Sequence, residues 1–474
     1  MLSQNISDYI LNNFGSDHYN KYLEYLEGCE YVYIRVSEKQ DSRSLIKHLS
    51  AYGIKVKKFE HFPFSYEVIE GFEKIGKTLE YATGKYYIQS LSSMLPARVL
   101  NIKKNDLVLD MCAAPGSKTT QLSELMNNQG TLYANEPNKT RIKSLVHNLD
   151  RMNVLNTGVI QSWGEVISKY FNDYFNKILV DAPCSGLGIL KKKNEVNKWW
   201  SPKYVKRLTN IQLRLLISAI KSAEIGGEIV YSTCTLTIEE NELLINTLLK
   251  KYPVELCSID LPVKSHPAIN KYGGEKLNPQ ITRARRIVPW EINSEGFFIA
   301  KLIKLEKTEP MIKIEKSGKE VKLLSAKNKM INKHLQRVSN EFGIPLEILS
   351  DYKYILKGSD IHFIHQLWQS DKPGLFNRIG MKFGTIDRRD ICNLRSLSAQ
   401  ALSNFITKNI VQIEKLPELN TYLNGGTIKN YKNLTGQKII MYNNMIIGTA
   451  VAGKEGLKSQ FPRAMRTQNI IFPN

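Results

Sequence analysis

Between residues 106 and 305, short apolar segments alternate with longer amphipathic ones. Runs of apolar and β-branched residues predict strands at 106–111, 131–135, 156–160, 177–182, 227–233 and 296–304. Apolar residues spaced three or four apart predict helices at about 117–128, 138–152, 203–224 and 238–251. This regular alternation predicts an α/β fold, in which helices cover a doubly wound, mostly parallel sheet.

The segments on either side have different patterns. Residues 5–27 have helical spacing, and the strand YVYIRVS, an amphipathic segment and the strand IKVKKF follow. They predict a small basic α+β domain over 1–80, either an RNA-recognition-like appendage or a module that braces the next domain. After the core we expect a Lys-rich linker at 306–330, a middle domain at 331–387 beginning with a helix near 331–342, and a last domain at 388–474. The last domain has helix signals followed by strands at KIIMYNN and MIIGTAVAG.

Charge and cysteine usage narrow the class of protein. The 474-residue chain carries a formal net charge of +21, which favours a nucleic-acid partner, although a compositional bias toward Lys and Asn is the simpler explanation. There is no apolar run long enough to span a bilayer and no signal-peptide pattern, so we expect a cytoplasmic protein without membrane contact. Six cysteines without a CxxC pair, and histidines without HExxH, predict neither disulfides nor a metal site. Three cysteines in unrelated contexts are expected to be inert packing residues: Cys29, Cys257 and Cys392.

A candidate cofactor site follows the first predicted strand, in LVLDMCAAPGSKTTQLSEL (107–125). Its small residues allow close approach to the backbone, and free amides at the start of the next helix can bind an anionic group. The second strand ends at Glu136, where a carboxylate can accept both hydroxyls of a ribose. Because GxGxxG and GxxxxGK[ST] are absent, S-adenosylmethionine fits better than a dinucleotide or a nucleoside triphosphate.

Two later strands each end at a turn that contains a cysteine. KILVDAPCSGLG carries Asp181 and Cys184, and GEIVYSTCT carries Cys234. If both strands are parallel members of one sheet, both thiols lie at its carboxyl edge, where open α/β sheets bind ligands.

The motifs DMCAAPGSKT, DAPCSG and YSTCT, in this order, resemble those of the RNA (cytosine-5) methyltransferases of the NOL/NOP/Sun superfamily. Similar segments occur at YATGKYYIQSLSSMLPA (81–97) and RIVPWEINSEGFFIAKL (286–302), and the ending GLKSQFPRAMR (456–466) is similar to the bacterial branch that acts on 16S ribosomal RNA. The resemblance implies a Rossmann-like class I methyltransferase core at 81–305, with the α+β N-terminal domain before it and, after it, C-terminal α+β and PUA-like RNA-binding domains, the latter at 388–474. It implies that the protein methylates small-subunit ribosomal RNA, and we expect the protein to be a monomer. Transfer RNA is the alternative substrate, and a non-catalytic RNA-binding assembly factor is the alternative class.

The chemistry explains why cysteines are needed. Cytosine C5 is a poor nucleophile, so a thiolate must first add to C6. Spacing does not decide which thiol attacks; the resemblance implies that Cys234 attacks and Cys184 assists release. Asp181 is the candidate for stabilising charge at N3 of the base.

The resemblance also implies which residues hold the cofactor, namely Glu136, Arg141, Asp181 and the loop residues Cys112, Ala113, Ala114, Pro115, Gly116, Ser117 and Lys118. Lys118 serves either the cofactor or the cytosine, and Arg141 is otherwise an exposed helical residue. Where the family often has an aspartate that meets adenine, this chain has Ser162 and Trp163. Trp163 either stacks on the adenine or packs in the core, and we expect packing.

A basic and aromatic segment, LKKKNEVNKWWSPKYVKR (190–207), follows the first cysteine motif. Lys191, Lys192 and Lys193 can neutralise phosphates, and Trp199 or Trp200 can stack on an exposed base, one tryptophan being structural. A solvated basic face is the simpler alternative.

Overall fold

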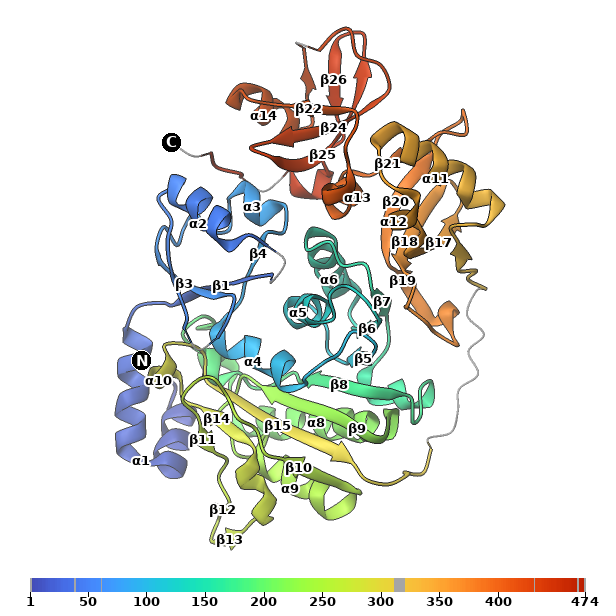
Figure 1. The fold of residues 1–474 in the computed structure, drawn as a ribbon. Coiled ribbons are helices and arrows are strands. Elements are labelled where there is room, and N and C mark those ends of the chain that lie inside the picture. The colour runs from blue at the N-terminus through green and yellow to red at the C-terminus, as the bar shows by residue number, and fades with distance from the viewer. Residues whose placement is uncertain are drawn as a thin grey trace.

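The computed structural model describes residues 2–37, 40–60, 62–310, 320–429, 431–466 and 469–472. Its centre is a ten-stranded sheet with the order β11-β14-β15-β9-β8-β5-β6-β7-β19 (Figure 1). β11 (His266–Pro267) and β14 (Arg285–Ile287) lie at one end, and β10 (Val254–Cys257) pairs with β15. Five neighbouring strands are parallel: β5 (Leu107–Asp110), β6 (Thr131–Asn135), β7 (Thr157–Ile160), β8 (Phe175–Asp181) and β9 (Ala223–Thr233). β15 (Phe297–Lys304) runs antiparallel to β9. The strands predicted from the apolar runs are therefore confirmed.

Helices cover both faces of this sheet because its strands are apolar on both sides. In β8, Ile178 and Val180 pack in the cluster that contains α8 (Pro202–Ser222) and α9 (Glu242–Lys251). Leu179, between them, packs in the cluster that contains α4 (Leu91–Val99) and α5 (Ser117–Leu125). Successive strand residues point to opposite faces, so one apolar run supplies both layers. α6 (Lys139–Arg151) follows β6.

The order of the strands determines where on the sheet a ligand can bind. From β5 the chain moves outward through β6 and β7, and then returns to β8 on the other side of β5. The crevice at such a reversal, beyond the carboxyl ends of the strands, is where open α/β sheets bind ligands. The loops after β5, β8 and β9 all lie there.

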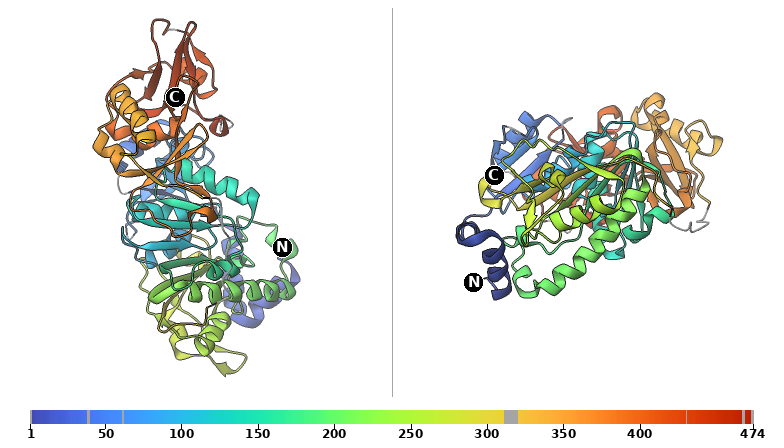
Figure 2. Two further views of the ribbon diagram at one scale, coloured as in Figure 1. Left: turned by 90° about the vertical axis from the view of Figure 1, so that its right-hand side faces the viewer. Right: turned by 90° about the horizontal axis from the view of Figure 1, so that it is seen from below.

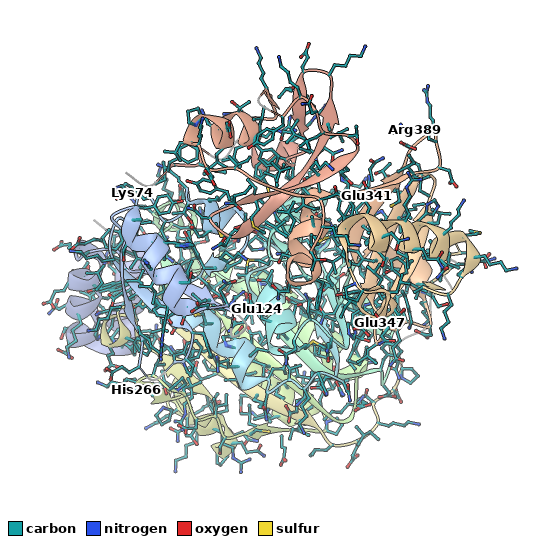
Figure 3. The ribbon with its side chains drawn as sticks, turned by 45° about the horizontal axis from the view of Figure 1, so that its top comes forward. Lys74, Glu124, His266, Glu341, Glu347 and Arg389 are labelled. Carbon is teal, nitrogen blue, oxygen red and sulfur yellow. The ribbon has the colours of Figure 1, made fainter. Side chains whose placement is uncertain are left out.

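The amino-terminal region forms two separate pieces. The first is a four-stranded antiparallel sheet, with the order β2-β3-β1-β4, built from β1 (Val32–Val36), β2 (Lys55–Lys58), β3 (Ser65–Glu70) and β4 (Tyr86–Ile88), with α2 (Ser42–Ala51) packed on it. The second is α1 (Gln4–Glu27), which breaks at Gly15 and packs with Leu187 and Trp200, in the segment that follows β8. Arg35 of β1 bonds Glu124 of α5 at 2.8 Å, which ties the sheet to the core; Glu124 is labelled in Figure 3.

Two further five-stranded sheets make up the carboxyl-terminal region, which gives the molecule an elongated shape (Figure 2). One has the order β16-β17-β18-β20-β21 and packs against α11 (Lys329–Phe342); its strands are β16 (Leu324–Ser325), β17 (Tyr352–Lys357), β18 (Asp360–His365), β20 (Met381–Ile386) and β21 (Cys392–Leu394). The other has the order β22-β24-β25-β26-β23 and includes the hairpin predicted by KIIMYNN and MIIGTAVAG, β24 (Gln437–Tyr442) and β25 (Met445–Gly453). Its other strands are β22 (Ile410–Gln412), β23 (Thr427–Ile428) and β26 (Gly456–Ser459). Of the linker expected at 306–330, residues 311–319 lie outside the described residues.

One strand from the range expected for the middle domain belongs to the central ten-stranded sheet. β19 (Phe376–Ile379) pairs antiparallel with β7 and becomes the edge strand. Beside it, the fully buried Trp368 packs against Tyr133 of β6 and Phe376. The carboxyl-terminal region thus completes the core around the central sheet. Across the described ranges, no helix is long and apolar enough to cross a membrane.

Candidate active site

The loop between β5 and α5 is shaped to receive a ligand. Gly116 is the N-cap of α5, has φ 110° and, having no side chain, makes no cap bond to the amides of the first helical turn. The loop backbone is held from the neighbouring strand, since the Ala113 amide donates to the Asn135 carbonyl at 2.9 Å. Thr119 Oγ1 donates to Asp110 Oδ2 at 2.7 Å and so ties the helix back to the end of β5. Free amides at a helix N-terminus attract a carboxylate.

Asp110 is a feature that the sequence reasoning treated only as a strand end. Its side chain is 1% exposed, and its Oδ1 has no hydrogen-bond partner in the described structure. Burial raises the pKa of this carboxyl to about 7. A buried, unpaired acceptor beside the loop is suited to a cationic group of a ligand, which would satisfy it. The sequence signal that could have identified Asp110 is an aspartate at the end of a strand, followed by a loop of small residues.

Glu136 follows β6, the strand next to β5, and is 1% exposed. Its Oε1 accepts from the Asn138 amide at 3.0 Å, and its Oε2 lies 3.1 Å from the Arg141 guanidinium. Arg141 also donates to the Ala114 carbonyl at 2.5 Å, although its side chain is half exposed. The structure therefore brings Glu136 and Arg141 to the loop.

Trp163 corrects one expectation. Its side chain is 67% exposed, so the expected packing in the core is wrong. The backbone around it is anchored instead: the Ser162 amide donates to Asn135 Oδ1 at 3.2 Å, and Gly164 sits closely against Leu215 and Met111. With its neighbours held, the indole stays at the surface beyond the carboxyl end of β7, beside the strand that leads to Glu136.

Asp181 and Lys118 form an ion pair at the end of β8. Lys118 Nζ lies 2.7 Å from Asp181 Oδ2, donates to Ser93 Oγ at 2.9 Å, and is 5.3 Å from the centre of the Phe297 ring. The other Asp181 oxygen accepts from Ser232 Oγ at 2.8 Å. The Lys118 side chain is 7% exposed and that of Asp181 is 30% exposed, so the carboxylate has the more open position.

The two thiols named by the sequence motifs meet at the same edge. Cys184 Sγ and Cys234 Sγ are 3.3 Å apart. The hydrogen bond with Cys234, followed by burial, raises the pKa of the Cys184 thiol well above its usual range. The loops are joined by the Gly188 amide, which donates to the Cys234 carbonyl at 3.0 Å. A side chain at Gly188 would place its Cβ 2.2 Å from the Gly296 carbonyl oxygen, so this contact requires glycine.

The side chains of the basic segment after Cys184 lie in different environments. Lys191 Nζ donates to the Tyr25 carbonyl at 2.6 Å and lies over the Tyr25 ring, and Lys192 pairs with Glu295 at 2.7 Å. Lys193 is exposed. Trp200 is 2% exposed and packs with α1, whereas Trp199 is 41% exposed. The expectation that one of the two tryptophans is structural is confirmed.

The remaining cysteines differ in exposure. Cys392 is buried and Cys257 is half-buried, but Cys29 is exposed, so the expectation that Cys29 packs in the interior is wrong because its turn lies outside the core. Among the described residues, no cluster of His, Cys, Asp and Glu side chains could hold a metal ion.

The donor set fits S-adenosylmethionine. Its ribose hydroxyls need a carboxylate, which Glu136 could supply, and its amino-acid end needs an acceptor and free amides, which Asp110 and the start of α5 could supply. Sequence reasoning also missed Glu240 and Gln212, which bond the loop around Cys184. Neither residue lies in a motif that points to them.

Comparison with known proteins gives the same picture. Residues 97–303 match the family described as 16S rRNA methyltransferase RsmB/F. The chain is 31% identical over 408 residues to ribosomal RNA small subunit methyltransferase F of Shewanella piezotolerans, covering 84% of this chain and 82% of that protein. It is 37% identical over 253 residues to a tRNA (cytosine(49)-C(5))-methyltransferase of Pyrococcus abyssi, covering 52% of this chain and 81% of that protein.

A solved structure shares the fold of the core. The crystal structure of a methyltransferase homologue protein from Pyrococcus horikoshii superposes with a TM-score of 0.56 at 33% identity, covering 63% of this chain and 94% of that one. The α/β core is thus that of a Rossmann-like methyltransferase. The chain belongs to the RsmB/F family of RNA cytosine-5 methyltransferases, enzymes that use S-adenosylmethionine.

Proposed function

We propose that this protein methylates C5 of a cytosine in small-subunit ribosomal RNA through a covalent adduct between Cys234 and C6 of the base. The observation that carries the proposal is the pair of thiols, 3.3 Å apart, beside the Asp181–Lys118 ion pair at the ligand-binding edge of the sheet. A non-catalytic RNA-binding factor would have no use for this arrangement. The relatives that match most of the chain act on the small subunit by name, which favours that substrate.

S-adenosylmethionine supplies the methyl group. Glu136 would accept the two ribose hydroxyls, and Asp110 Oδ1 would accept from the ammonium group. The backbone amides in the first turn of α5 would donate to the carboxylate of the cofactor. The exposed indole of Trp163 would cover the adenine in place of a carboxylate contact. Each of these groups is held by its own strand or helix end, so the cofactor would be oriented before RNA arrives.

Attack begins when Cys234 Sγ forms a bond to C6 and the electron pair moves toward C5. Asp181, still accessible in its ion pair, would pass the proton released by the Cys234 thiol to N3, and the protonated N3 would then donate to its carboxylate, which neutralises the charge that develops on the ring. C5 then takes the methyl group. For release, solvent water would take the C5 proton, the C5–H electron pair would restore the C5–C6 double bond, and the Cys234–C6 bond would break with its electrons returning to sulfur, which recovers the N3 proton through Asp181. Cys184, in contact with the sulfur that leaves, would assist this last step.

Trapping the adduct tests the assignment of the two thiols. With Cys184→Ala, release is blocked, so a covalent protein–RNA species should accumulate on denaturing gels in the presence of cofactor. With Cys234→Ala, both the adduct and methyl transfer should be lost. An adduct that forms with Cys234→Ala and not with Cys184→Ala would reverse the roles.

The substrate is tested separately. Transfer of tritiated methyl groups to naked 16S RNA, assembled small subunits and transfer RNA should label small-subunit RNA. Labelling of transfer RNA alone would favour the second candidate, which the similarity to the Pyrococcus abyssi tRNA enzyme supports. Absence of labelling of any RNA, under conditions where a related enzyme is active, would contradict the proposal. Comparing methylcytosine in RNA from strains with and without the gene would then locate the target.

A further inference from the structure

A buried carboxylate lies behind the two catalytic loops. Glu240 follows the Cys234 loop, and its side chain is fully buried. Its Oε1 accepts from the Ser185 amide at 2.9 Å and from Gln212 Nε2 at 2.8 Å, and its Oε2 accepts from Thr237 Oγ1 at 2.6 Å. The residue is not needed to bind the cofactor, and it is not one of the groups that take part in the proposed attack.

These hydrogen bonds hold the Cys184 loop on both sides of the thiol. Gln212 Nε2 also donates to the Pro183 carbonyl at 2.8 Å, so the residues before and after Cys184 are both held by the Gln212–Glu240 pair. A second link joins the two loops directly, because the hydroxyls of Ser185 and Thr235 are 2.8 Å apart. The position of Cys184 against Cys234 therefore depends on Glu240.

The bonding pattern also indicates the charge of Glu240. Burial raises the pKa of its carboxyl, but the Ser185 amide and Gln212 Nε2 can only donate, and they favour the ionised form. This negative charge, bonded to the amide of Ser185 next to Cys184, opposes ionisation of the Cys184 thiol. It acts in the same direction as the three larger influences on Cys184, namely the hydrogen bond with Cys234, burial and the charge of Cys234, and all four raise the pKa of that thiol.

We propose that Glu240 is a positioning residue that assigns the two thiols their roles: its carboxylate fixes Cys184 beside Cys234, and its charge keeps Cys184 a neutral thiol, so that attack falls to Cys234. The proposal rests on the proposed function in one respect, the identity of the attacking thiol. A neutral Cys184 does not compete for C6, because the thiolate is the nucleophilic form.

Titration of Cys184 tests the charge without RNA or cofactor. In a Cys234→Ser background, the rate of Cys184 alkylation by iodoacetamide is measured by mass spectrometry between pH 7 and 11.5. E240Q can keep the geometry, since its amide oxygen can accept from Ser185 and Gln212 while its NH₂ group donates to Thr237. We expect the midpoint to fall by about one pH unit, which makes alkylation near pH 7.5 about tenfold faster.

The matched control is E239Q. Glu239, one residue earlier, binds the hydroxyls of Tyr9 and Tyr272, so its neutralisation should leave the Cys184 midpoint unchanged. Equal midpoints in E240Q and E239Q would overturn the proposal. Failure of RNA methylation by the wild type would contradict the proposed function but would leave this thiol titration readable.

E240D separates geometry from charge and remains informative if E240Q does not fold. It keeps the charge but withdraws the carboxylate by one methylene from the Ser185 amide. We expect the raised midpoint to persist in the Cys234→Ser background, while methyl transfer by the single variant falls at least about tenfold, because one loop bond is lost. A midpoint as low as that of an ordinary cysteine in E240D would refute the role of the charge, and unimpaired turnover would refute the role in positioning.

Discussion

Asp110→Asn should make the protein more stable at alkaline pH and weaken its hold on the cofactor. The carboxyl has a pKa of about 7 in the fold, against 3.8 in a model peptide. Between these values the folded state binds a proton that the unfolded state has lost. The stability due to this proton is therefore fully present below pH 3.8 and is lost as the pH rises through 7.

The magnitude follows from the two pKa values. The pH range from 5 to the folded pKa of about 7 covers two pH units, and each pH unit lowers the free energy of unfolding by about 1.4 kcal/mol. The wild type should therefore lose about 3 kcal/mol of stability from this group between pH 5 and 8. D110N has no such titration. Its melting temperature, relative to that of wild type, should therefore rise as the pH increases from 5 to 8, by several degrees.

The same variant tests the role of Asp110 toward the ammonium group. If binding requires the ionised carboxylate, wild-type affinity for S-adenosylhomocysteine should fall about tenfold from pH 8 to pH 6, as measured by titration calorimetry. D110N should bind about 10- to 100-fold more weakly at pH 8 and lack this pH dependence. The control is D106N, at the opposite end of β5, where Asp106 accepts from the Lys103 amide at 2.7 Å; it should bind like wild type. An equal pH dependence in D110N and wild type would refute the reasoning.

Three further substitutions probe other parts of the molecule. Trp163→Ala should weaken S-adenosylhomocysteine binding about tenfold through loss of stacking, whereas Trp199→Ala should not; equal affinities would show that the indole does not cover the adenine. Gly188→Ala should abolish adduct formation, because its Cβ would clash with the Gly296 carbonyl; an unchanged adduct yield would contradict this. Trp368→Ala should cost about 3–5 kcal/mol in chemical unfolding of the catalytic domain, since the indole is fully buried against β6 and β7; unfolding confined to the carboxyl-terminal sheets would argue against that packing.

Much of the fold could be predicted along the chain because its signals are local. The β-branched runs, the glycine turn at Gly116 and the apolar spacing of the helices predict strands, loop and helices within a few residues of where they lie. The cysteine motifs also indicated a shared edge, because the carboxyl ends of parallel strands must meet there. That Cys184 and Cys234 would meet followed from these patterns, although their roles did not.

Other features depend on contacts between distant residues, which local patterns do not encode. β19 joins the catalytic sheet although it lies more than two hundred residues after β7, because it covers an edge that no nearby segment reaches. We expected Trp163 to pack in the core, yet its anchored neighbours leave its side chain exposed. Asp110 owes its unusual pKa to burial, and Glu240 owes its place beside Cys184 to a turn that folds back after β9. The motifs of the sequence thus name the reacting groups, whereas the packing around them determines which groups carry charge and which one is free to react.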